Sequence, residues 1–430
     1  MVHPAAEREA PRQFLLDCFQ AALEAVDARR CVREHLTIAD SRRTFQGDWH
    51  VIAIGKAAGA MALGAIEALG GRIAGGCVIT AAGHVPAELP SRAPHLMLLQ
   101  GAHPLPDASS IEAGVQLVRL VQELPVKARV LCLVSGGASS LVEYPVRGIT
   151  LDDLQCVGNF ALSAGVSIEE INCIRRQLSQ IKGGGLANML GERRILALMV
   201  SDVPRDDPRV IGSGLLHASP DAGPATIAGL PREIEAIVQR AMNSQGVQTL
   251  LREKAIPTQI VASQRKASVA AARLAQAGGV SVTVSRQRLH GEAAVLGVAC
   301  AGATTKLPER TLRIWAGEST VTLPGHAGRG GRNQHLALSA ACAFAASDRD
   351  DAWLLAAGTD GIDGVTDDAG AIVDSGTCAR GADAGRDCHL SLSGADSGTF
   401  LEAAGDLLHT GATLTNVGDM VLGLRWRRRA

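Results

Sequence analysis

The chain has 430 residues, which at roughly 100–200 residues per domain corresponds to two or three domains. Hydrophobic residues make up 47% and charged residues 20%, which excludes a disordered protein because this composition can build a large core. The 42 basic and 43 acidic side chains leave a formal net charge of −1, so no field of one sign exists to gather nucleic acid or coat an anionic membrane. Any anionic ligand must therefore be held by a local site.

The ten cysteines are scattered without a Cys-x-x-Cys pair, so their spacing supports neither a zinc knuckle nor a disulfide framework. The first ten residues carry charge and proline where a signal peptide needs an apolar stretch. No run of about 18 uncharged apolar residues predicts a membrane span. From these features we expect a soluble cytoplasmic protein without a nucleic-acid or membrane partner.

Short apolar runs alternate with helical patterns along the chain. The runs are typical of strands buried on both faces of a parallel sheet and cover residues 51–54, 76–80, 130–134, 195–200, 280–284, 312–315 and 353–357. Helical patterns cover residues 14–26, 111–124, 264–277 and 334–344. This alternation predicts two Rossmann-like α/β domains, residues 1–240 and 255–430, with a polar helix and linker over residues 221–259.

In open parallel sheets, ligands bind beyond the carboxyl ends of the strands, so the residues that follow each run are the candidates for a site. Gly55 and Lys56 follow the first run. A lysine in the first turn of a helix opposes the helix dipole, and a bound anion would explain it. Because Ala57 follows where a Walker A loop needs serine or threonine, this is not such a loop. An exposed surface lysine is the alternative.

The run that ends at Val134 is followed by two glycines and by serines. Glycine lets backbone N–H groups approach a ligand, and serine can cap the next helix or donate to an oxyanion. An ordinary serine-capped turn is the alternative. The candidate ligand-binding residues here are Ser135, Gly136, Gly137 and Ser139.

The next predicted helix carries polar side chains at three or four, seven and ten residues after Asn172, so that they share one face of the helix. A glycine triplet then ends the helix. A solvated amphipathic face is the alternative to a binding role. The candidate binding residues on this face are Asn172, Arg175 and Lys182.

Acidic residues end two further strands. Asp202 follows the run over 195–200, where a carboxylate can hold magnesium or accept a proton. Asp360 and Asp363 follow the run over 353–357, with a spacing that does not match an EF-hand. These three aspartates are the candidate metal ligands, and turn residues are the alternative.

The loop over residues 325–334 concentrates glycine and arginine before a predicted helix. Flexible backbone donors beside fixed cations describe a phosphate clamp. A polar turn near the end of the chain either closes a ligand-binding cleft or is a simple loop. The candidate binding residues of the loop and the turn are Gly330, Gly331, Arg332, Asn333, Thr415 and Asn416.

Taken together, these motifs resemble the glycerate 2-kinases with a MOFRL carboxy-terminal domain, a family often called hydroxypyruvate reductases. The resemblance runs from about residue 12 to residue 424. It rests on Gly55-Lys56-Ala57, Ser135-Gly136-Gly137, Asn172 with Arg175, Leu178 to Gly184, Ser201-Asp202-Val203-Pro204, Gly317-Glu318, Gly330 to Gln334, Thr359 to Gly364 and Thr415-Asn416-Val417.

The resemblance implies a glycerate-kinase domain over residues 1–240, a MOFRL-like domain over residues 255–430, and an active-site cleft between them. It also implies ATP-dependent, magnesium-requiring phosphorylation of D-glycerate to 2-phosphoglycerate. Lys56, Arg332 and Asp202 are then the predicted catalytic residues. Either Asp202 or Asp360 accepts the proton of the substrate hydroxyl, and a homodimer is one candidate assembly.

The chain departs from the family pattern at five positions: Ala138, Arg205, Leu215, His335 and Leu414. The first, second and last of these replace glycine and add side chains where backbone was to approach a ligand, and we expect Leu414 at positive φ. Two other functions remain open. An NAD(P)H-dependent hydroxypyruvate reductase is one, although the chain has no Gly-x-Gly-x-x-Gly with a downstream ribose-binding acid. A diverged family member that binds another small sugar acid is the other.

Overall fold

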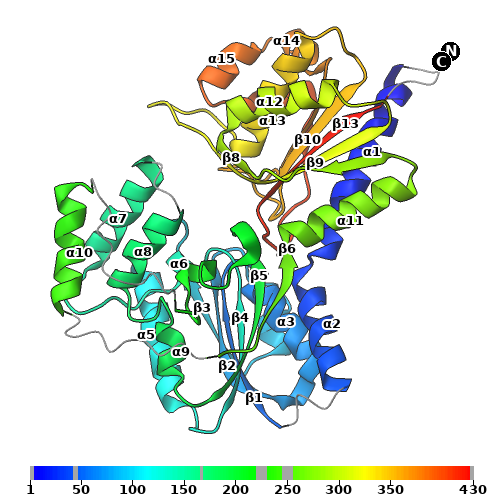
Figure 1. Ribbon diagram of the computed structural model, residues 1–430. Helices are drawn as coiled ribbons and strands as arrows, with labels where there is room; N and C mark the ends of the chain where they lie inside the picture. The colour runs from blue at the N-terminus through cyan, green and yellow to red at the C-terminus, as the bar shows by residue number, and fades with distance from the viewer. Residues whose placement is uncertain (1–3, 42–46, 165–167, 219–229, 245–254, 427–430) are drawn as a thin grey trace. The chain divides into compact units, whose positions relative to one another are not determined.

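The computed structural model describes residues 4–41, 47–164, 168–218, 230–244 and 255–426, which form two compact units (Figure 1). One unit comprises residues 28–261, and the other combines residues 1–27 with residues 262–430. Both units are α/β, as predicted. The boundaries differ from the predicted 1–240 and 255–430, because the first 27 residues group with the C-terminal part of the chain. Of the predicted linker, residues 221–229 and 245–254 lie outside the described residues.

The unit of residues 28–261 is built on a six-stranded sheet with the order β3-β2-β1-β4-β5-β6. Its strands are β1 (Trp49–Ile54), β2 (Ile73–Ala81), β3 (Leu96–Gly101), β4 (Arg129–Val134), β5 (Arg194–Ser201) and β6 (Thr258–Ser263). The pairings of β1 with β2 and β4, of β2 with β3 and of β4 with β5 are parallel. The apolar runs predicted in this half therefore lie in a parallel sheet, and their carboxyl ends share one edge.

Helices cover both faces of this sheet. The helices of this unit are α2 (Ala28–Ser41), α3 (Ala58–Leu69), α4 (Leu89–Arg92), α5 (Ala108–Glu123), α6 (Ala138–Leu141), α7 (Leu151–Ala164), α8 (Ile168–Leu178), α9 (Gly185–Met189) and α10 (Arg232–Ser244). Figure 1 shows α2 and α3 on one face and α5 and α9 on the other. Leu117, Val121 and Leu186 bury the second face.

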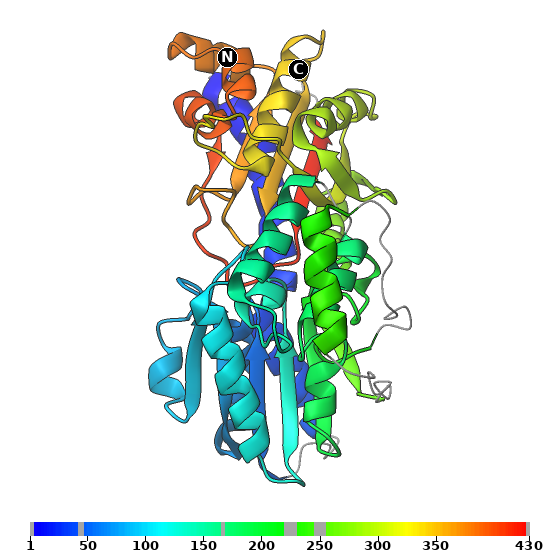
Figure 2. The same ribbon diagram turned by 90° about the vertical axis from the view of Figure 1, so that its left-hand side faces the viewer.

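Beside the sheet, α7, α8 and α10 pack into a core of their own, which includes Leu154, Ile174 and Ile237 (Figures 1 and 2). Helix α10 is the helix predicted within the polar stretch. Its apolar positions Ile234, Ile237, Val238 and Ala241 recur at helical spacing, so one face of the helix is buried and the rest is charged.

The second unit is built on a sheet with the order β12-β11-β10-β13-β9-β7, in which β8 also pairs with β9. Its strands are β7 (Ser281–Val284), β8 (Leu289–Glu292), β9 (Thr311–Thr320), β10 (Ala352–Gly358), β11 (Gly370–Asp374), β12 (Leu407–Leu408) and β13 (Asp419–Arg425). β7 and β8 run parallel to β9, whereas β10, β11, β12 and β13 pair antiparallel. The prediction of parallel strands is confirmed for the pairing of β7 with β9 and is wrong for β10, because an apolar run indicates burial on both faces but not strand direction.

Helices also cover both faces of the second sheet. They are α1 (Pro4–Ala25), α11 (Gln264–Ala277), α12 (Ala293–Thr305), α13 (Arg332–Ala345), α14 (Thr377–Asp383), α15 (Cys388–Ser393) and α16 (Ser397–Ala404). Helices α12 and α13 pack closely, since a Cβ on Gly297 would lie 2.3 Å from the Leu336 carbonyl oxygen. Figure 1 shows α1 and α11 on the opposite face. None of the described helices combines the length and apolar character that a membrane span requires.

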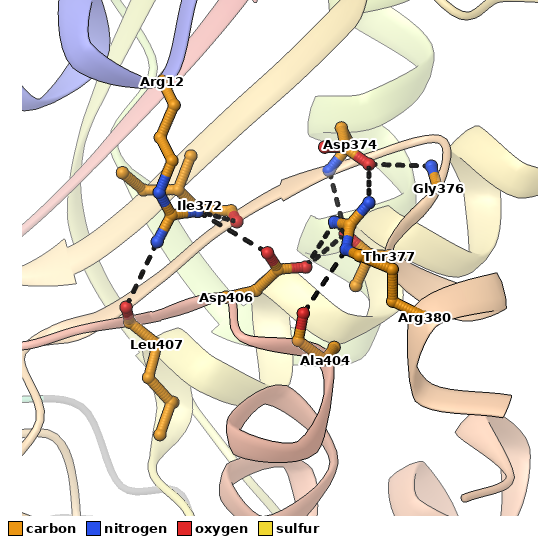
Figure 3. Close-up of polar contacts among 9 residues, drawn as sticks. All are labelled: Arg12, Ile372, Asp374, Gly376, Thr377, Arg380, Ala404, Asp406 and Leu407. Atoms are coloured by element: carbon orange, nitrogen blue, oxygen red, sulfur yellow. Dashed lines mark hydrogen bonds and ion pairs between the residues drawn. The ribbon is translucent and has the colours of Figure 1, made fainter. Parts of the chain in front are cut away.

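Arg12 explains why the first helix belongs to this unit (Figure 3). Its guanidinium donates to the carbonyl oxygens of Ile372 at 3.2 Å and Leu407 at 3.4 Å, and it lies 3.5 Å from the Asp406 carboxylate. Asp406 is fully buried and also pairs with Arg380 at 2.6 Å. Because a buried carboxylate is costly without cationic partners, these contacts hold α1 against β11 and β12. Nothing in the sequence near Arg12 identifies partners so far along the chain.

Candidate active site

The loops that follow β1 and β4 are hydrogen-bonded to each other. The Lys56 amide donates to the Gly136 carbonyl at 2.9 Å, and the Ser135 amide donates to the Ile54 carbonyl at 3.0 Å. The buried Ser135 hydroxyl accepts a hydrogen bond from the Ala57 amide at 3.0 Å. Ser135 thus fixes the position of the lysine loop, and the two sequence motifs form one structure at the carboxyl edge of the sheet.

Two glycines make this arrangement sterically possible. Gly55 has φ +129°, and a Cβ there would lie 2.2 Å from the Ser135 hydroxyl oxygen. Gly137 has φ +81°, and a Cβ there would lie 3.1 Å from both Lys56 Cγ and His103 Cδ2. A side chain at either position would be strained and crowded. The stem of Lys56 therefore lies against the backbone of Gly137.

A chain of hydrogen-bonded polar side chains connects the segment after β4 to α8. The Ser139 and Ser213 hydroxyls are hydrogen-bonded, and Ser213 donates to Asn172 Oδ1 at 2.8 Å. The Asn172 amide nitrogen in turn contacts the Val210 carbonyl at 3.5 Å. Ser213 and Asn172 are both buried, so these bonds satisfy polar groups that have lost contact with water. Asn172 positions Ser213 and Ser139.

Lys182 and Glu143 form a buried ion pair, with side chains 1% and 3% exposed. Burial lowers the pKa of Lys182, while the neighbouring Glu143 carboxylate opposes that shift. A buried lysine requires such a counter-charge because an isolated buried ammonium is very costly. The polar face predicted around Lys182 is therefore not a solvated one.

A pocket adjoins this ion pair. It is lined by Pro106, Ser139, Ser140, Glu143, Leu154, Val157, Gly158, Arg175, Leu178 and Lys182. Burial lowers the pKa of Arg175, and the charge of Glu143 opposes that shift. Within the described part of the chain the Arg175 guanidinium makes no hydrogen bond. A cation with unused donors in a partly enclosed pocket is suited to a carboxylate or phosphate of a ligand.

In the second unit, Asp363 holds the start of α13. Its carboxylate accepts hydrogen bonds from the Asn333 amide at 3.0 Å, the Asn333 side chain at 3.2 Å and the Gln334 amide at 2.8 Å. A Cβ on Gly331 would lie 2.3 Å from the Asp363 carboxyl carbon, so glycine is needed for this approach. Burial raises the pKa of Asp363 to about 7, although these amides favour the ionised form. Both carboxylate oxygens are used within the protein.

Arg332 is bound by two carboxylates of its own unit. It contacts Asp419 at 2.7 and 3.0 Å in a bidentate arrangement and Glu318 at 2.6 Å. Burial acts to lower the pKa of Arg332, but Asp419 and Glu318 raise it further than burial lowers it. The guanidinium that sequence analysis assigns to a phosphate is therefore engaged in joining α13 to β9 and β13.

The polar turn before β13 is also held internally. The Thr415 hydroxyl donates to the Val26 carbonyl at 2.6 Å, and Asn416 Oδ1 accepts from the Gly418 amide at 3.1 Å. Asp360 Oδ1 accepts from the Ile362 amide at 3.3 Å. Thr415 thus connects the turn to the end of α1, and these side chains build the turn itself.

Comparisons with known proteins agree with this architecture. Residues 14–252 match the model of a domain of unknown function, DUF4147, and residues 311–419 match the model of the MOFRL family. A D-glycerate 2-kinase of Thermotoga maritima is 34% identical over 426 residues, which cover 97% of this chain and 99% of the relative.

The chain belongs to the glycerate 2-kinase family. The crystal structure of a glycerate kinase from Thermotoga maritima matches with a TM-score of 0.79 and 32% identity, covering 97% of this chain and all of that chain. A relative from Agrobacterium vitis is 37% identical over 95% of this chain and 93% of its own length. That relative carries the provisional name of a hydroxypyruvate reductase.

Two departures from the family pattern adopt the backbone conformation that glycine favours. Arg205 has φ +63° and Leu414 has φ +58°. The expectation of a positive φ at Leu414 is confirmed. The turns keep a glycine-like geometry at these positions although the residues carry side chains, and each residue therefore has backbone strain.

The other three departures lie in packed surroundings. Ala138 is buried as the first residue of α6, and Leu215 is buried in the same core. His335 is buried in α13, where its Nδ1 lies 3.0 Å from the Ser397 hydroxyl, and burial lowers its pKa. These residues pack within the protein, and His335 contacts the neighbouring helix α16 through Ser397.

The structure brings some predicted site residues together and assigns others to different units. Ser139, Arg175 and Lys182 line one pocket, with Asn172 two hydrogen bonds away through Ser213. Asp202 follows β5 in one unit, whereas Asp360 and Asp363 belong to the other.

Sequence reasoning missed Glu143, and it noted the turns that contain Ser213 and Asp419 without including these two residues among the candidates. The available signal for Glu143 was indirect, namely that a buried lysine needs a carboxylate, and Lys182 lies beyond α8, which ends at Leu178, rather than on the predicted helix. Asp419 follows the polar turn that contains Thr415 and is the first residue of β13. Its position directly after that turn was the only sign in the sequence that it belongs to the site.

Proposed function

We propose that this chain is an ATP-dependent glycerate 2-kinase, which transfers the γ-phosphoryl group to the 2-hydroxyl of D-glycerate with magnesium. The observation that carries the proposal is the match to the Thermotoga maritima D-glycerate 2-kinase along 97% of the chain, through both family regions. Hydroxypyruvate reduction is the second candidate, favoured by the name of the Agrobacterium vitis relative. It is the weaker one, because the sequence lacks a dinucleotide-binding Gly-x-Gly-x-x-Gly.

The loop around Lys56 fits a phosphate group. Positive-φ glycines at 55 and 137 keep side chains away from this edge of the sheet, and the lysine stem lies against Gly137. Phosphoryl transfer needs mainly positioning and charge neutralisation, so one cation held by a rigid loop supplies what the reaction demands. We assign Lys56 to the transferring phosphoryl group, with the loop of Gly136 and Gly137 beside it.

Magnesium, when bound, would neutralise negative charge on the phosphate oxygens. Among the three predicted ligands, Asp363 does not fit this role because its carboxylate oxygens accept hydrogen bonds from the start of α13. Asp202, partly exposed at the end of β5, is the residue we assign to magnesium. Asp360 is the second candidate, and either aspartate could accept the hydroxyl proton of the substrate.

The pocket beside Lys182 fits the carboxylate of glycerate. Arg175 offers a planar set of donors, and carboxylates bind such donors in a bidentate manner. The Lys182–Glu143 pair contributes no net charge, so Arg175 gives the pocket its positive character. We assign Arg175 to the substrate carboxylate and the buried pair to the pocket wall.

Arg332 has a different role in this proposal. Because Asp419 and Glu318 already bind its guanidinium, we assign it to positioning α13 and its preceding glycine loop. Lys56→Met should then lower kcat/KM and leave stability unchanged, whereas Arg332→Met should lower both.

The test is ADP release by the purified chain with D-glycerate, L-glycerate and hydroxypyruvate, each with magnesium and with EDTA. Phosphorus NMR of the product distinguishes the 2-phosphate from the 3-phosphate ester. NADH oxidation with hydroxypyruvate but no ADP release would contradict the kinase and support the reductase.

Lys127→Met, a change of an exposed lysine before β4, is the matched control for Lys56→Met. A fixed cation facing a transferring phosphoryl can contribute about 10³–10⁵ in rate. Retention of more than about a tenth of wild-type kcat/KM in Lys56→Met would remove Lys56 from its assigned role, since one decade is only about 1.4 kcal/mol of barrier.

A further inference from the structure

Three cysteines and a histidine, none of them assigned a role above, gather in the second unit. Cys342 lies in α13, Cys378 in α14, and Cys388 and His389 form the first turn of α15. The Sγ atoms of Cys342 and Cys378 are 3.8 Å apart. One ligand atom each from Cys342, Cys388 and His389 lie within 4.8 Å of one another. All these cysteines are free thiols.

The separation of the Cys342 and Cys378 sulfurs suits a tetrahedral metal site, and Cys378 is the fourth candidate ligand beside the mutually close set of Cys342, Cys388 and His389. Zinc binds thiolate sulfur at about 2.3 Å, so two sulfurs in a regular tetrahedron around it are about 3.8 Å apart. This is the distance between Cys342 and Cys378. A set of three cysteines and one histidine is one of the ligand sets that structural zinc sites use. The residues come from three helices, and no Cys-x-x-Cys spacing signals them in the sequence.

The surroundings allow an ion to enter and hold two of the ligands in place. The three cysteines are half-buried and His389 is exposed, so the cluster is open to solvent on one side. The Asp387 carboxylate accepts hydrogen bonds from the amides of His389 and Leu390, each at 2.9 Å. This cap fixes the start of α15 and therefore the positions of Cys388 and His389.

We propose that Cys342, Cys378, Cys388 and His389 form a structural zinc site. The bound ion would join α14 and α15 to α13, the helix whose first residues hold Asp363 and Asp419. The site is separate from magnesium and from phosphoryl transfer, and it does not depend on the proposed function. Coordination by three thiols releases three protons, so zinc affinity should rise with pH.

The experiment uses the full-length chain, reduced with a phosphine and freed of metal by a chelator. Zinc is titrated against a chromophoric competitor, and Co²⁺ is added separately as a spectroscopic probe. We expect one zinc ion per chain, together with the thiolate charge-transfer band and the intense d–d bands of tetrahedral cobalt. Zinc should also raise the melting temperature of the reduced protein.

Two variants test the ligands without depending on a core position. His389→Gln changes an exposed side chain, and Cys388→Ser changes a half-buried one at the start of a short helix. Each should weaken zinc binding at least about tenfold, since even outer-shell partners of zinc ligands contribute 10–100-fold. Cys156→Ser in the other unit is the control and should bind zinc as the wild type does.

Three results would overturn the proposal. One is the absence of stoichiometric zinc in the reduced wild-type chain. Another is unchanged affinity in both His389→Gln and Cys388→Ser. The third is a reduced protein that takes up no metal, and in which oxygen from air removes two hydrogens from Cys342 and Cys378 to form a disulfide. That result would identify the cluster as a thiol pair.

Discussion

Replacing Glu143 with glutamine should strongly destabilise the unit of residues 28–261. The change leaves Lys182 with its side chain 1% exposed and without its carboxylate partner. Removing one member of a buried ion pair costs about 3–5 kcal/mol, because the remaining charge is desolvated without compensation. Domains have total stabilities of about 5–15 kcal/mol, so this single change consumes a large part of the stability of the unit.

Hydrogen exchange measured by mass spectrometry separates the two units, which a global unfolding curve does not. Amides of β4, which leads into the segment of Glu143, should exchange about a hundredfold to several-thousandfold faster, since 1.4 kcal/mol corresponds to a factor of ten. Amides of β10 in the other unit should be unchanged. Asp207→Asn is the matched control, because it breaks the exposed pair with Arg209 and should cost at most about 1 kcal/mol.

The loss in Glu143→Gln should depend on pH. Burial lowers the pKa of Lys182, and removal of the carboxylate lowers it further. The native state then releases its proton before the unfolded state, whose lysine titrates near 10.4, so stability rises with pH between these two pKa values. The deficit should therefore shrink as the pH rises toward the pKa of lysine in the unfolded state.

Lys182→Met added to Glu143→Gln should recover part of the loss, because the double variant leaves neither charge buried. A Glu143→Gln protein that exchanges like Asp207→Asn, or a double variant whose loss equals the sum of the single losses, would refute this account of the pocket.

Three further predictions concern the turns and the second unit. Leu414→Gly should raise the stability of its unit by up to about 1 kcal/mol. A left-handed conformation costs about 1–2 kcal/mol in a non-glycine residue, and the entropy that a glycine backbone loses on folding offsets roughly 0.5–1 kcal/mol of that gain. Slower amide hydrogen exchange in β13 would support the prediction, and faster exchange would contradict it. Gly331→Ala should cost roughly 1–3 kcal/mol, since the new Cβ meets the Asp363 carboxyl group, and an unchanged melting temperature would contradict so close an approach of the two residues. Burial raises the pKa of Asp363 to about 7, so its protonation stabilises the folded unit. This stability is complete below the unfolded pKa of about 3.9 and is lost as pH rises through about 7, by as much as about 1.4 kcal/mol per pH unit. Asp363→Asn should flatten this pH dependence, and an equal pH slope in both proteins would disprove the prediction.

The sequence by itself determined the α/β class and the strand-end motifs of the first unit. Gly55, Lys56 and Ser135 to Gly137 could be found because parallel strands bring their carboxyl ends to one edge, so residues that follow two separate runs must lie near each other. The positive φ of Leu414 could be inferred because glycine was expected at that position. Each of these inferences depends on local pattern or on a rule of sheet geometry.

Only the tertiary structure decided which charges meet. Arg332 looked like a free cation in a glycine loop, but Asp419, 87 residues further on, and Glu318 bind it. Glu143 carried no signal until Lys182 was found buried beside it. Strand direction in the second sheet was equally hidden, because burial on both faces gives the same apolar run in either direction. Cys342 of α13 and Cys378 of α14 are 36 residues apart in the chain, and helix packing brings their sulfur atoms to 3.8 Å, since side-chain partners at long sequence separation are selected by packing and not by spacing.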